Sequence, residues 1–260
     1  GLHQEYRKRL LEMYESYQNN RSLVQKNEAE RLDYYMMWAH QIKTPIAAIK
    51  LLIQSNLDGT EDSVGQGDIA QYDHPDQRFP LERELFKIES YVEMVLHYLR
   101  LDSISADMVL KHYNIMMMVK RVVKKYAVLF IDRQIAIELT EESKAIGQII
   151  TTDEKWFSFI IEQLLSNAIK YTPSGTISIL LEGDRLIIAD TGIGIRTEDL
   201  PRIFERGFTG YNGRIDQKAT GIGLYLSKQV ASRLGIGISV LSQSGAGTRV
   251  ILDLSDLTKM

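Results

Sequence analysis

Two segments with apolar residues spaced alternately three and four positions apart constrain the fold of this chain most. This spacing is typical of helices that pack along an apolar seam. We therefore predict a helical hairpin, and because two helices alone bury little apolar surface, we expect it to dimerise into a four-helix bundle. The seam residues are Leu32, Tyr35, Ala39, Ile42, Ile46, Ile49 and Ile53 in the first segment, and Leu81, Leu85, Ile88, Val92, Val95 and Leu99 in the second.

The stretches before and between the two seams have different patterns. Residues 2–20 carry apolar side chains at helical spacing, followed by a polar break at Asn19 and Asn20, which predicts a separate connector helix. Residues 57–80 are rich in Gly, Asp and Gln and have no period, which predicts a flexible acidic loop between the hairpin helices. A tolerated insertion is the favoured interpretation of this loop.

Beyond residue 110 the pattern changes to helices alternating with short β-rich runs, which predicts an α/β layer. The helical patterns cover 114–130, 153–171 and a segment ending near Leu234, and the β-rich runs cover 135–139, 148–152, 176–182, 185–190 and a closing hairpin over 237–254. The predicted organisation is a connector helix (1–30), a helical hairpin (31–105) and an α/β domain (110–260).

Composition excludes several classes of function. A chain of 260 residues with 44% hydrophobic and 25% charged residues suits a soluble globular protein of about two domains. The net charge of −3 and the scattered Lys and Arg leave no basic face, so nucleic acids are not expected partners. The chain has no Cys, which excludes disulfides and thiolate metal sites. Because it starts without Met and enters a helical pattern at once, we expect the cytosolic part of a longer protein, and because it lacks a long apolar run, we expect the chain itself to be soluble.

His40 is the first candidate for chemistry. It lies one position after the seam residue Ala39, so its imidazole should face outward from a rigid helix. An exposed histidine held on such a helix is a candidate nucleophile, whereas the alternative is an ordinary surface side chain.

The second group of candidates lies in the α/β half of the chain. Gln163, Asn167, Lys170 and Tyr171 fall on one face of a predicted helix and suit Mg²⁺, phosphate and a base; a solvated helix face is the alternative. Asp190 ends an apolar run and precedes two glycines, which suits a hydrogen bond to an exocyclic amine with the backbone close to a ligand; a tight turn without a ligand is the alternative.

Two further glycine motifs are weaker. Gly221 and Gly223 precede a predicted helix, whose first N–H groups are able to bind phosphate, although such a pair is usually only a helix start. The stretch from Gly245 to Thr248 is a hairpin turn, and a simple glycine turn is its favoured interpretation in isolation.

In this order, the motifs resemble those of the sensor histidine kinases of bacterial two-component systems, from about residue 30 to residue 253. The matching motifs are His40 to Pro45 (phosphoacceptor box), Asn167 to Tyr171 (N box), Asp190 to Gly194 (G1 box), Ile203 to Phe208 (F box) and Gly221 to Leu224 (G2 box). Within that family the chain is most similar to the small-sensor kinases of Gram-positive bacteria that respond to antimicrobial peptides alongside ABC transporters.

The resemblance implies the α/β sandwich of gyrase, Hsp90 and MutL-type ATPases rather than a P-loop fold. It implies ATP and Mg²⁺ as cofactors and a response regulator as partner. By the same resemblance Asn167 would hold Mg²⁺, Lys170 and Arg206 would contact phosphates, Tyr171 would pack on the nucleotide, and Asp190 would bind the adenine amine. The other implied nucleotide-binding positions are Gly192, Gly194, Phe204, Phe208, Gly221, Gly223 and Thr248. Residues 205–220, including Lys218, would form a mobile lid.

Two positions depart from the family pattern. Most members carry Glu or Asp after the phosphoacceptor, whereas Gln41 cannot act as a base at neutral pH, which predicts slow autophosphorylation. Related ATPases place a glutamate at the position of Gln163 to activate water, so its amide favours phosphoryl transfer over hydrolysis. Since kinases usually have Asn there, a contact between Gln163 and the metal stays open.

Thr44 lies on the same helix face as His40 and is placed to orient a water for dephosphorylating the regulator. The main prediction is thus a homodimeric histidine kinase that phosphorylates His40 and also acts as a phosphatase. Gln41 motivates the alternative, a catalytically weak signalling scaffold or phosphatase whose nucleotide domain sets conformation. An ATPase or chaperone of the same fold is least favoured, because of Gln163.

Overall fold

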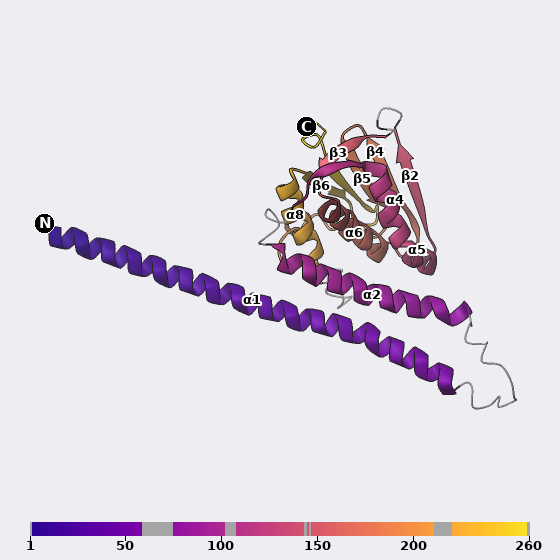
Figure 1. The fold of residues 1–260 in the computed structure, drawn as a ribbon, viewed down its shortest axis with the longest axis horizontal. Coiled ribbons are helices and arrows are strands. Elements are labelled where there is room, and N and C mark those ends of the chain that lie inside the picture. Colours follow the sequence, from indigo (N-terminus) through magenta and orange to yellow (C-terminus); the bar gives the residue numbers. More distant parts are fainter. Residues whose placement is uncertain are drawn as a thin grey trace.

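The chain forms a long helical hairpin beside an α/β domain (Figure 1). The computed structural model describes residues 2–58, 75–101, 108–142, 145, 147–210 and 220–258. The first helix, α1 (Leu2–Asp58), is much longer than the second, α2 (Pro75–Leu99), and its N-terminal half projects away from the rest of the chain. Helix α2 lies between α1 and the α/β domain, so it contacts both.

The expected break at Asn19 and Asn20 is wrong, because α1 continues through both residues. Each Asn costs less than about 1 kcal/mol relative to Ala in a helix, which a long helix absorbs. The expected loop is also shorter than predicted, since residues 75–80 belong to α2. Pro75 suits the first position of a helix, where an N–H would have no intrahelical partner. The centre of that loop, residues 59–74, lies outside the described residues.

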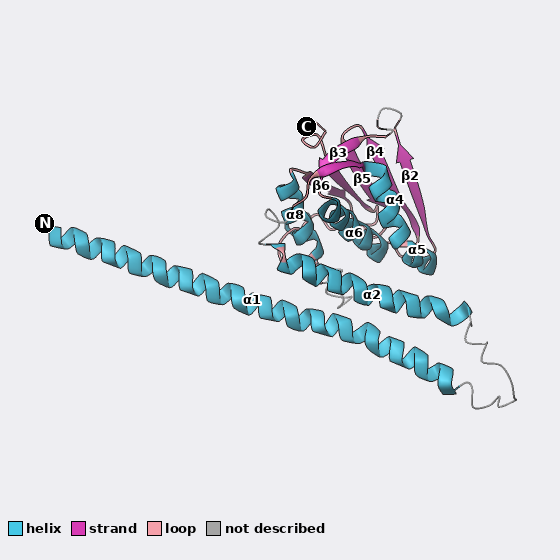
Figure 2. Ribbon diagram, in the orientation of Figure 1, coloured by secondary structure: helices cyan, strands magenta, loops and turns pink. Residues whose placement is uncertain are grey.

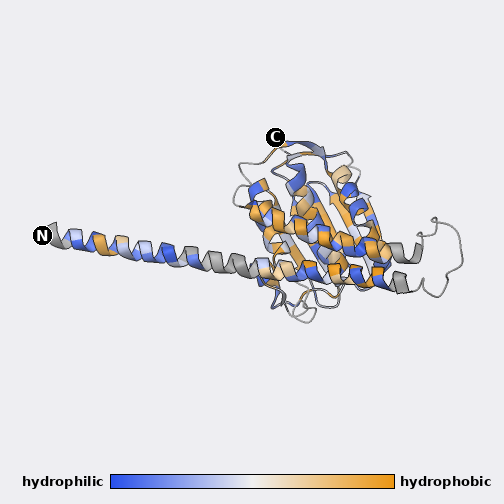
Figure 3. Cartoon of the chain, turned by 60° about the horizontal axis from the view of Figure 1, so that its bottom comes forward, coloured by the Kyte–Doolittle hydropathy of each residue, from blue (hydrophilic) through white to orange (hydrophobic). Residues whose placement is uncertain are grey.

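The two hairpin helices pack along one side and leave much of the apolar seam uncovered. Trp38 of α1 is only 2% exposed, and its ring meets that of Tyr98 of α2 edge to face, with 5.1 Å between centroids. Apolar and hydrophilic residues alternate along both helices (Figure 3). Seam residues that remain 39–51% exposed are Tyr35, Ile46, Ile53, Leu85, Val92 and Leu99. A single chain therefore does not bury the seam that its sequence predicts.

The α/β domain is built on a five-stranded sheet with the strand order β2-β4-β5-β7-β6. Strands β2 and β4 are parallel, and all other neighbours in this sheet are antiparallel. The strands are β2 (Ile135–Glu141), β4 (Gly175–Glu182), β5 (Arg185–Asp190), β6 (Gly237–Ser242) and β7 (Thr248–Asp253). Along β4 the buried residues are Ile177, Ile179 and Leu181, which is the period of two expected for a sheet with one covered face.

The helices α4 (Ile115–Lys125), α6 (Glu154–Tyr171) and α8 (Gly223–Leu234) lie on one face of this sheet (Figure 2). A two-stranded antiparallel sheet of β1 (Lys111–Asn114) and β3 (Ile149–Thr152) stands beside them. The single helix expected over 114–130 is wrong in one respect, because the chain turns at Tyr126 and continues as α5 (Ala127–Arg133). Tyr126 is buried there, with its ring 4.9 Å from that of Phe86 of α2.

Helix α6 carries the motif that the sequence places on one helix face. It begins after Asp153, whose carboxylate accepts hydrogen bonds from the N–H groups of Lys155 and Trp156. Its apolar face is buried in the core, with Ile160, Ile161 and Leu165 inaccessible to solvent. The opposite, polar face meets the end of β5 and the start of α8, where the candidate site lies.

Among the described residues, no helix combines the length and the apolar character that crossing a membrane requires.

Candidate nucleotide-binding site

A pocket of about 230 Å³ lies between the polar face of α6, the end of β5, the start of α8 and the 208–210 segment. It gathers most of the residues singled out from the sequence motifs. Those lining it are Gln163, Asn167, Lys170, Tyr171, Asp190, Gly194, Phe208, Gly221, Gly223 and Thr248. The fold thus brings the N, G1, F and G2 motifs and the turn before β7 to one cavity.

Three expected binding residues do not line the pocket in this arrangement. Gly192 packs closely against the end of α6, where an added Cβ would be 2.2 Å from the carbonyl oxygen of Tyr171. Phe204 lies with its ring centroid 5.1 Å from the Lys228 ammonium. Arg206 donates a hydrogen bond to the hydroxyl of Tyr98 on α2, so a phosphate contact would require Arg206 to leave Tyr98.

Asp190 presents its carboxylate at the floor of the pocket. Its Oδ1 accepts hydrogen bonds from the backbone N–H groups of Gly192, at 2.9 Å, and Thr248, at 3.2 Å. Burial raises the pKa of Asp190 above its ordinary value, and the two N–H donors partly offset this rise. Since a carboxylate offers about four acceptor positions, it retains capacity for a donor group on a ligand.

The turn between β6 and β7 packs backbone on backbone against the loop that follows Asp190. Gly194 has φ +66°, and an added Cβ would be 2.0 Å from the carbonyl oxygen of Gln243. Gly247 has φ +84°, and an added Cβ would be 2.0 Å from the carbonyl oxygen of Asp190. The N–H of Gly245 also donates to the carbonyl of Ile193 at 2.8 Å. This turn is therefore part of the pocket wall and more than the simple glycine turn that its local sequence favours.

The start of α8 is held close to α6. An added Cβ on Gly223 would be 2.6 Å from Oε1 of Gln163, which is only 8% exposed. The N–H of Gly207 donates to the carbonyl of Gly221 at 3.0 Å, which ties the F motif to the G2 motif. Of the expected lid, residues 205–210 and 220 are described, and Lys218 lies outside the described residues.

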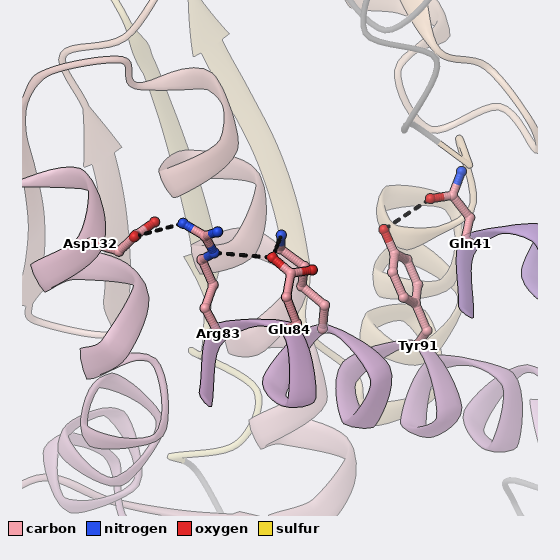
Figure 4. A network of polar contacts seen from close by, with 6 residues as sticks. Gln41, Arg83, Glu84, Tyr91 and Asp132 are labelled. Atoms are coloured by element: carbon pink, nitrogen blue, oxygen red, sulfur yellow. Dashed lines mark hydrogen bonds and ion pairs between the residues drawn. The ribbon is translucent and has the colours of Figure 1, made fainter. Parts of the chain in front are cut away.

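Residues of the hairpin complete the pocket, and the sequence motifs did not indicate them. Tyr91 and Met94 of α2 line the cavity together with Arg196 and Asp199 of the domain. The hydroxyl of Tyr91 donates to Oε1 of Gln41 on α1 at 3.1 Å, and the two side chains point toward one another (Figure 4). Tyr91 thereby links the cavity to the segment that carries His40.

His40 is exposed on α1, as expected, and does not itself line the pocket. One turn later, the hydroxyl of Thr44 donates to the carbonyl oxygen of His40 at 3.2 Å. A hydroxyl oxygen in this position retains lone pairs for a water molecule.

Helix α2 is held against the α/β domain along its length. Near its start, Arg83 bonds Asp132 of α5 at 2.9 Å (Figure 4). Further along, the Lys125 ammonium bridges Glu93 of α2, at 2.6 Å, and Glu162 of α6, at 3.0 Å. These contacts keep Tyr91 and Met94 at the pocket in this arrangement.

His97 adds an aromatic contact at the other end of α2. Its ring stacks on Phe159 with 4.4 Å between centroids and meets Trp156 edge to face. Burial lowers the pKa of His97, which favours the neutral ring in this apolar contact.

The pocket suits a metal ion that enters with a polyphosphate. Among the described residues, no three His, Cys, Asp or Glu side chains gather as a cage. Mg²⁺ is commonly held by one or two side-chain oxygens, water and substrate phosphates. The amide oxygens of Asn167 and Gln163, both in the lining, are ligands of that kind.

Comparison with known proteins agrees with this architecture. Residues 152–258 match the family described as histidine kinase-, DNA gyrase B-, and HSP90-like ATPase. The chain is 33% identical over 230 residues to the sensor protein BceS of Bacillus subtilis, covering 87% of this chain and 62% of that protein. It is 30% identical to the B. subtilis sensor histidine kinase YxdK, covering 88% and 66%. It is 35% identical to the sensor kinase GraS of Staphylococcus aureus, covering 83% and 58%. The chain thus spans less than two thirds of each relative.

Solved structures share the fold at lower identity. The histidine kinase AdeS of Acinetobacter baumannii superposes with a TM-score of 0.52 at 19% identity, covering 83% of this chain and 98% of that one. Full-length ShkA, solved in complex with AMPPNP, superposes with a TM-score of 0.54 at 20% identity, covering 85% and 45%. A helical hairpin followed by an ATPase-type α/β domain is thus a known arrangement, and the fold class expected from the sequence is confirmed. With its motifs gathered in one pocket, the chain carries the ATPase domain of the histidine kinases and is similar over most of its own length to sensor kinases such as BceS and GraS.

Proposed function

We propose that this chain transfers the γ-phosphoryl group of ATP to His40 and then to an aspartate of a response regulator receiver domain. The observation that carries the proposal is the link between the pocket and the phosphoacceptor segment. Tyr91 lines the cavity that contains the N, G1 and G2 motifs, and its hydroxyl bonds Gln41, the neighbour of His40. This hydrogen bond supports the proposal because it links the cavity to the helix segment that carries His40.

The chemistry requires positioning more than a strong base. A neutral imidazole nitrogen of His40 attacks the γ-phosphorus, the bond to the β,γ-bridging oxygen breaks, ADP departs and the imidazole proton passes to solvent. Mg²⁺, when bound, supplies charge neutralisation at the phosphates. Asn167 would hold the metal, with Gln163 beside it, and Lys170 lines the same cavity as a cation for the phosphates. Asp190 and Thr248, which also line the cavity, would contact the adenine base.

We further propose that the working form is a homodimer. The uncovered seam residues, among them Ile46 and Val92, give the hairpin a second apolar face, and a second copy of the hairpin would cover it as a four-helix bundle. The full-length protein would be a membrane-anchored sensor whose cytoplasmic portion is this chain, and a membrane transporter is a proposed partner. No nucleic-acid partner is proposed.

Phosphatase activity toward the regulator is a separate proposal that depends on Thr44. Its hydroxyl lies one helical turn after His40, bonded to the His40 carbonyl oxygen, and has lone pairs to orient a water. In Thr44→Ala we expect loss of most regulator dephosphorylation, while labelling of His40 by ATP is retained. The decay of phosphorylated regulator, followed with and without the kinase chain, measures this. Full phosphatase activity in the variant would show that Thr44 has no such role.

The proposed kinase reaction is tested by incubating the chain with γ-labelled ATP and Mg²⁺. We expect an acid-labile, base-stable label that is absent in both His40→Gln and Asn167→Ala. Mixing these two variants as a dimer shows whether labelling occurs between subunits. The second candidate, a weak scaffold favoured by Gln41, predicts tight ATP binding without label. Sustained phosphate release without label would instead indicate an ATPase.

A further inference from the structure

Ser242, the last residue of β6, lies behind the pocket wall and makes three polar contacts. Its hydroxyl accepts a hydrogen bond from the N–H of Ile195 at 2.9 Å and donates to the carbonyl oxygen of Gly247 at 2.8 Å. Its Oγ also lies 3.0 Å from Oγ1 of Thr248, its partner in the β6–β7 ladder. Ser242 thus joins the G1 loop, the hairpin turn and Thr248 at one atom.

The direction of the third contact follows from counting protons. A serine hydroxyl has one proton and two lone pairs. The carbonyl of Gly247 is only able to accept, so it takes the proton, and the N–H of Ile195 is only able to donate, so it takes one lone pair. The remaining lone pair of Ser242 faces Thr248. Thr248 must therefore donate to Ser242, and its own hydroxyl proton points away from the pocket.

The direction of this hydrogen bond affects the part of the cavity proposed to hold the adenine base, because Thr248 lines the cavity beside Asp190. We call this part the base site. With its proton committed to Ser242, the Thr248 oxygen offers only lone pairs toward a ligand. The Asp190 carboxylate is likewise an acceptor. This corner of the pocket therefore presents two acceptors and selects a ligand edge, or an ordered water, that donates.

We propose that Ser242 is a positioning residue that fixes the Thr248 hydroxyl as an acceptor and so makes the nucleotide site selective for a purine with an amino group at C6. The inference rests on the proposed function in that the ligand is a nucleoside triphosphate. Inosine triphosphate is the probe, since it carries a carbonyl at C6 and a proton on N1 where ATP carries an amine and an unprotonated nitrogen. In the intact site this carbonyl faces acceptors and binds poorly.

Removing the Ser242 hydroxyl releases the Thr248 proton, which is then free to turn toward the ligand carbonyl. In Ser242→Ala we expect the ratio of the two dissociation constants, inosine triphosphate over ATP, to fall about five- to tenfold, the range of one hydrogen bond. Ser242→Thr keeps the hydroxyl and should keep the ratio. Ser239→Ala, at an exposed position of the same strand, is the matched control.

The measurement is calorimetric titration of the full chain with each nucleotide and Mg²⁺. Thr248→Val provides a second route, since it removes the acceptor together with its hydrogen bond to Ser242, leaves the contacts of Ser242 with Ile195 and Gly247 in place, and should lower the same ratio. In that background Ser242→Ala should have no further effect on the ratio. Equal weakening of both nucleotides in Ser242→Ala, or an unchanged ratio, would overturn the role of Ser242 alone. A wild-type chain that binds neither nucleotide would overturn the proposed function and this inference together.

Discussion

Gly247→Ala is expected to weaken ATP binding strongly, whereas Gly245→Ala, two residues earlier in the same turn, is expected to retain it. Both glycines have positive φ, +84° and +80°, so both variants bear the strain of a left-handed conformation, about 1–2 kcal/mol. Only at Gly247 would the new Cβ collide with backbone, 2.0 Å from the carbonyl oxygen of Asp190. At Gly245 nothing lies within 4 Å. Comparing the two variants therefore separates the effect of backbone strain at positive φ from the effect of the steric collision.

The collision at Gly247 would distort the base site around Asp190. The backbone around Asp190 has to move, which breaks the hydrogen bonds that its carboxylate accepts from Gly192 and Thr248. We expect ATP affinity to fall on the order of 100-fold or more, with a lower melting temperature. Titration calorimetry measures the affinity, and circular dichroism checks that the variant is folded. If a folded Gly247→Ala chain bound ATP as tightly as Gly245→Ala, the turn would not shape the site.

Gln41→Glu is expected to accelerate phosphorylation of His40. The Gln41 side chain accepts a hydrogen bond from the Tyr91 hydroxyl, and a carboxylate in the same place is able to accept it equally well, so the local arrangement should persist. In addition, a carboxylate is able to take up the imidazole proton, which an amide cannot do. General bases typically contribute about 100-fold or more, and we expect on the order of tenfold or more here.

Initial rates of label incorporation at saturating ATP measure this effect. Gln41→Ala serves as the control for simply removing the side chain, because it provides neither an acceptor for Tyr91 nor a base. An unchanged or lower rate in Gln41→Glu would contradict the view that Gln41 limits the reaction. Such a result would favour the scaffold interpretation, in which the nucleotide domain mainly sets the conformation of the chain.

Where the sequence pattern is periodic, it predicts the fold well. The three-and-four spacing predicts both hairpin helices, and the alternation along β4 predicts a strand with one buried face. The errors occur where local preference is weak. Asn19 and Asn20 suggest a break that a long helix overrides, and β1 has no apolar alternation, so its strand conformation depends on pairing with β3.

Some residues of the candidate site could be predicted from the sequence and others could not. Asn167, Lys170 and Asp190 belong to motifs whose chemistry can be inferred from the sequence, and the structure places all three in one cavity. Tyr91 and Ser242 carry no such signal. One is an ordinary helix residue and the other an ordinary strand residue, and each acquires its role only from the group that lies opposite it.

The sequence by itself determines which residues share a helix or strand face, because the periods of 3.6 and 2 are local properties of the backbone. It also determines the chemical types of the motif residues, including an amide rather than a carboxylate at Gln41. Only the tertiary structure decides which faces meet. The closure of the β6–β7 turn onto Asp190 and the placement of Tyr91 against both the pocket and Gln41 depend on contacts between residues far apart in the chain. Such contacts form only when the whole core packs, so they cannot be predicted from a local sequence pattern.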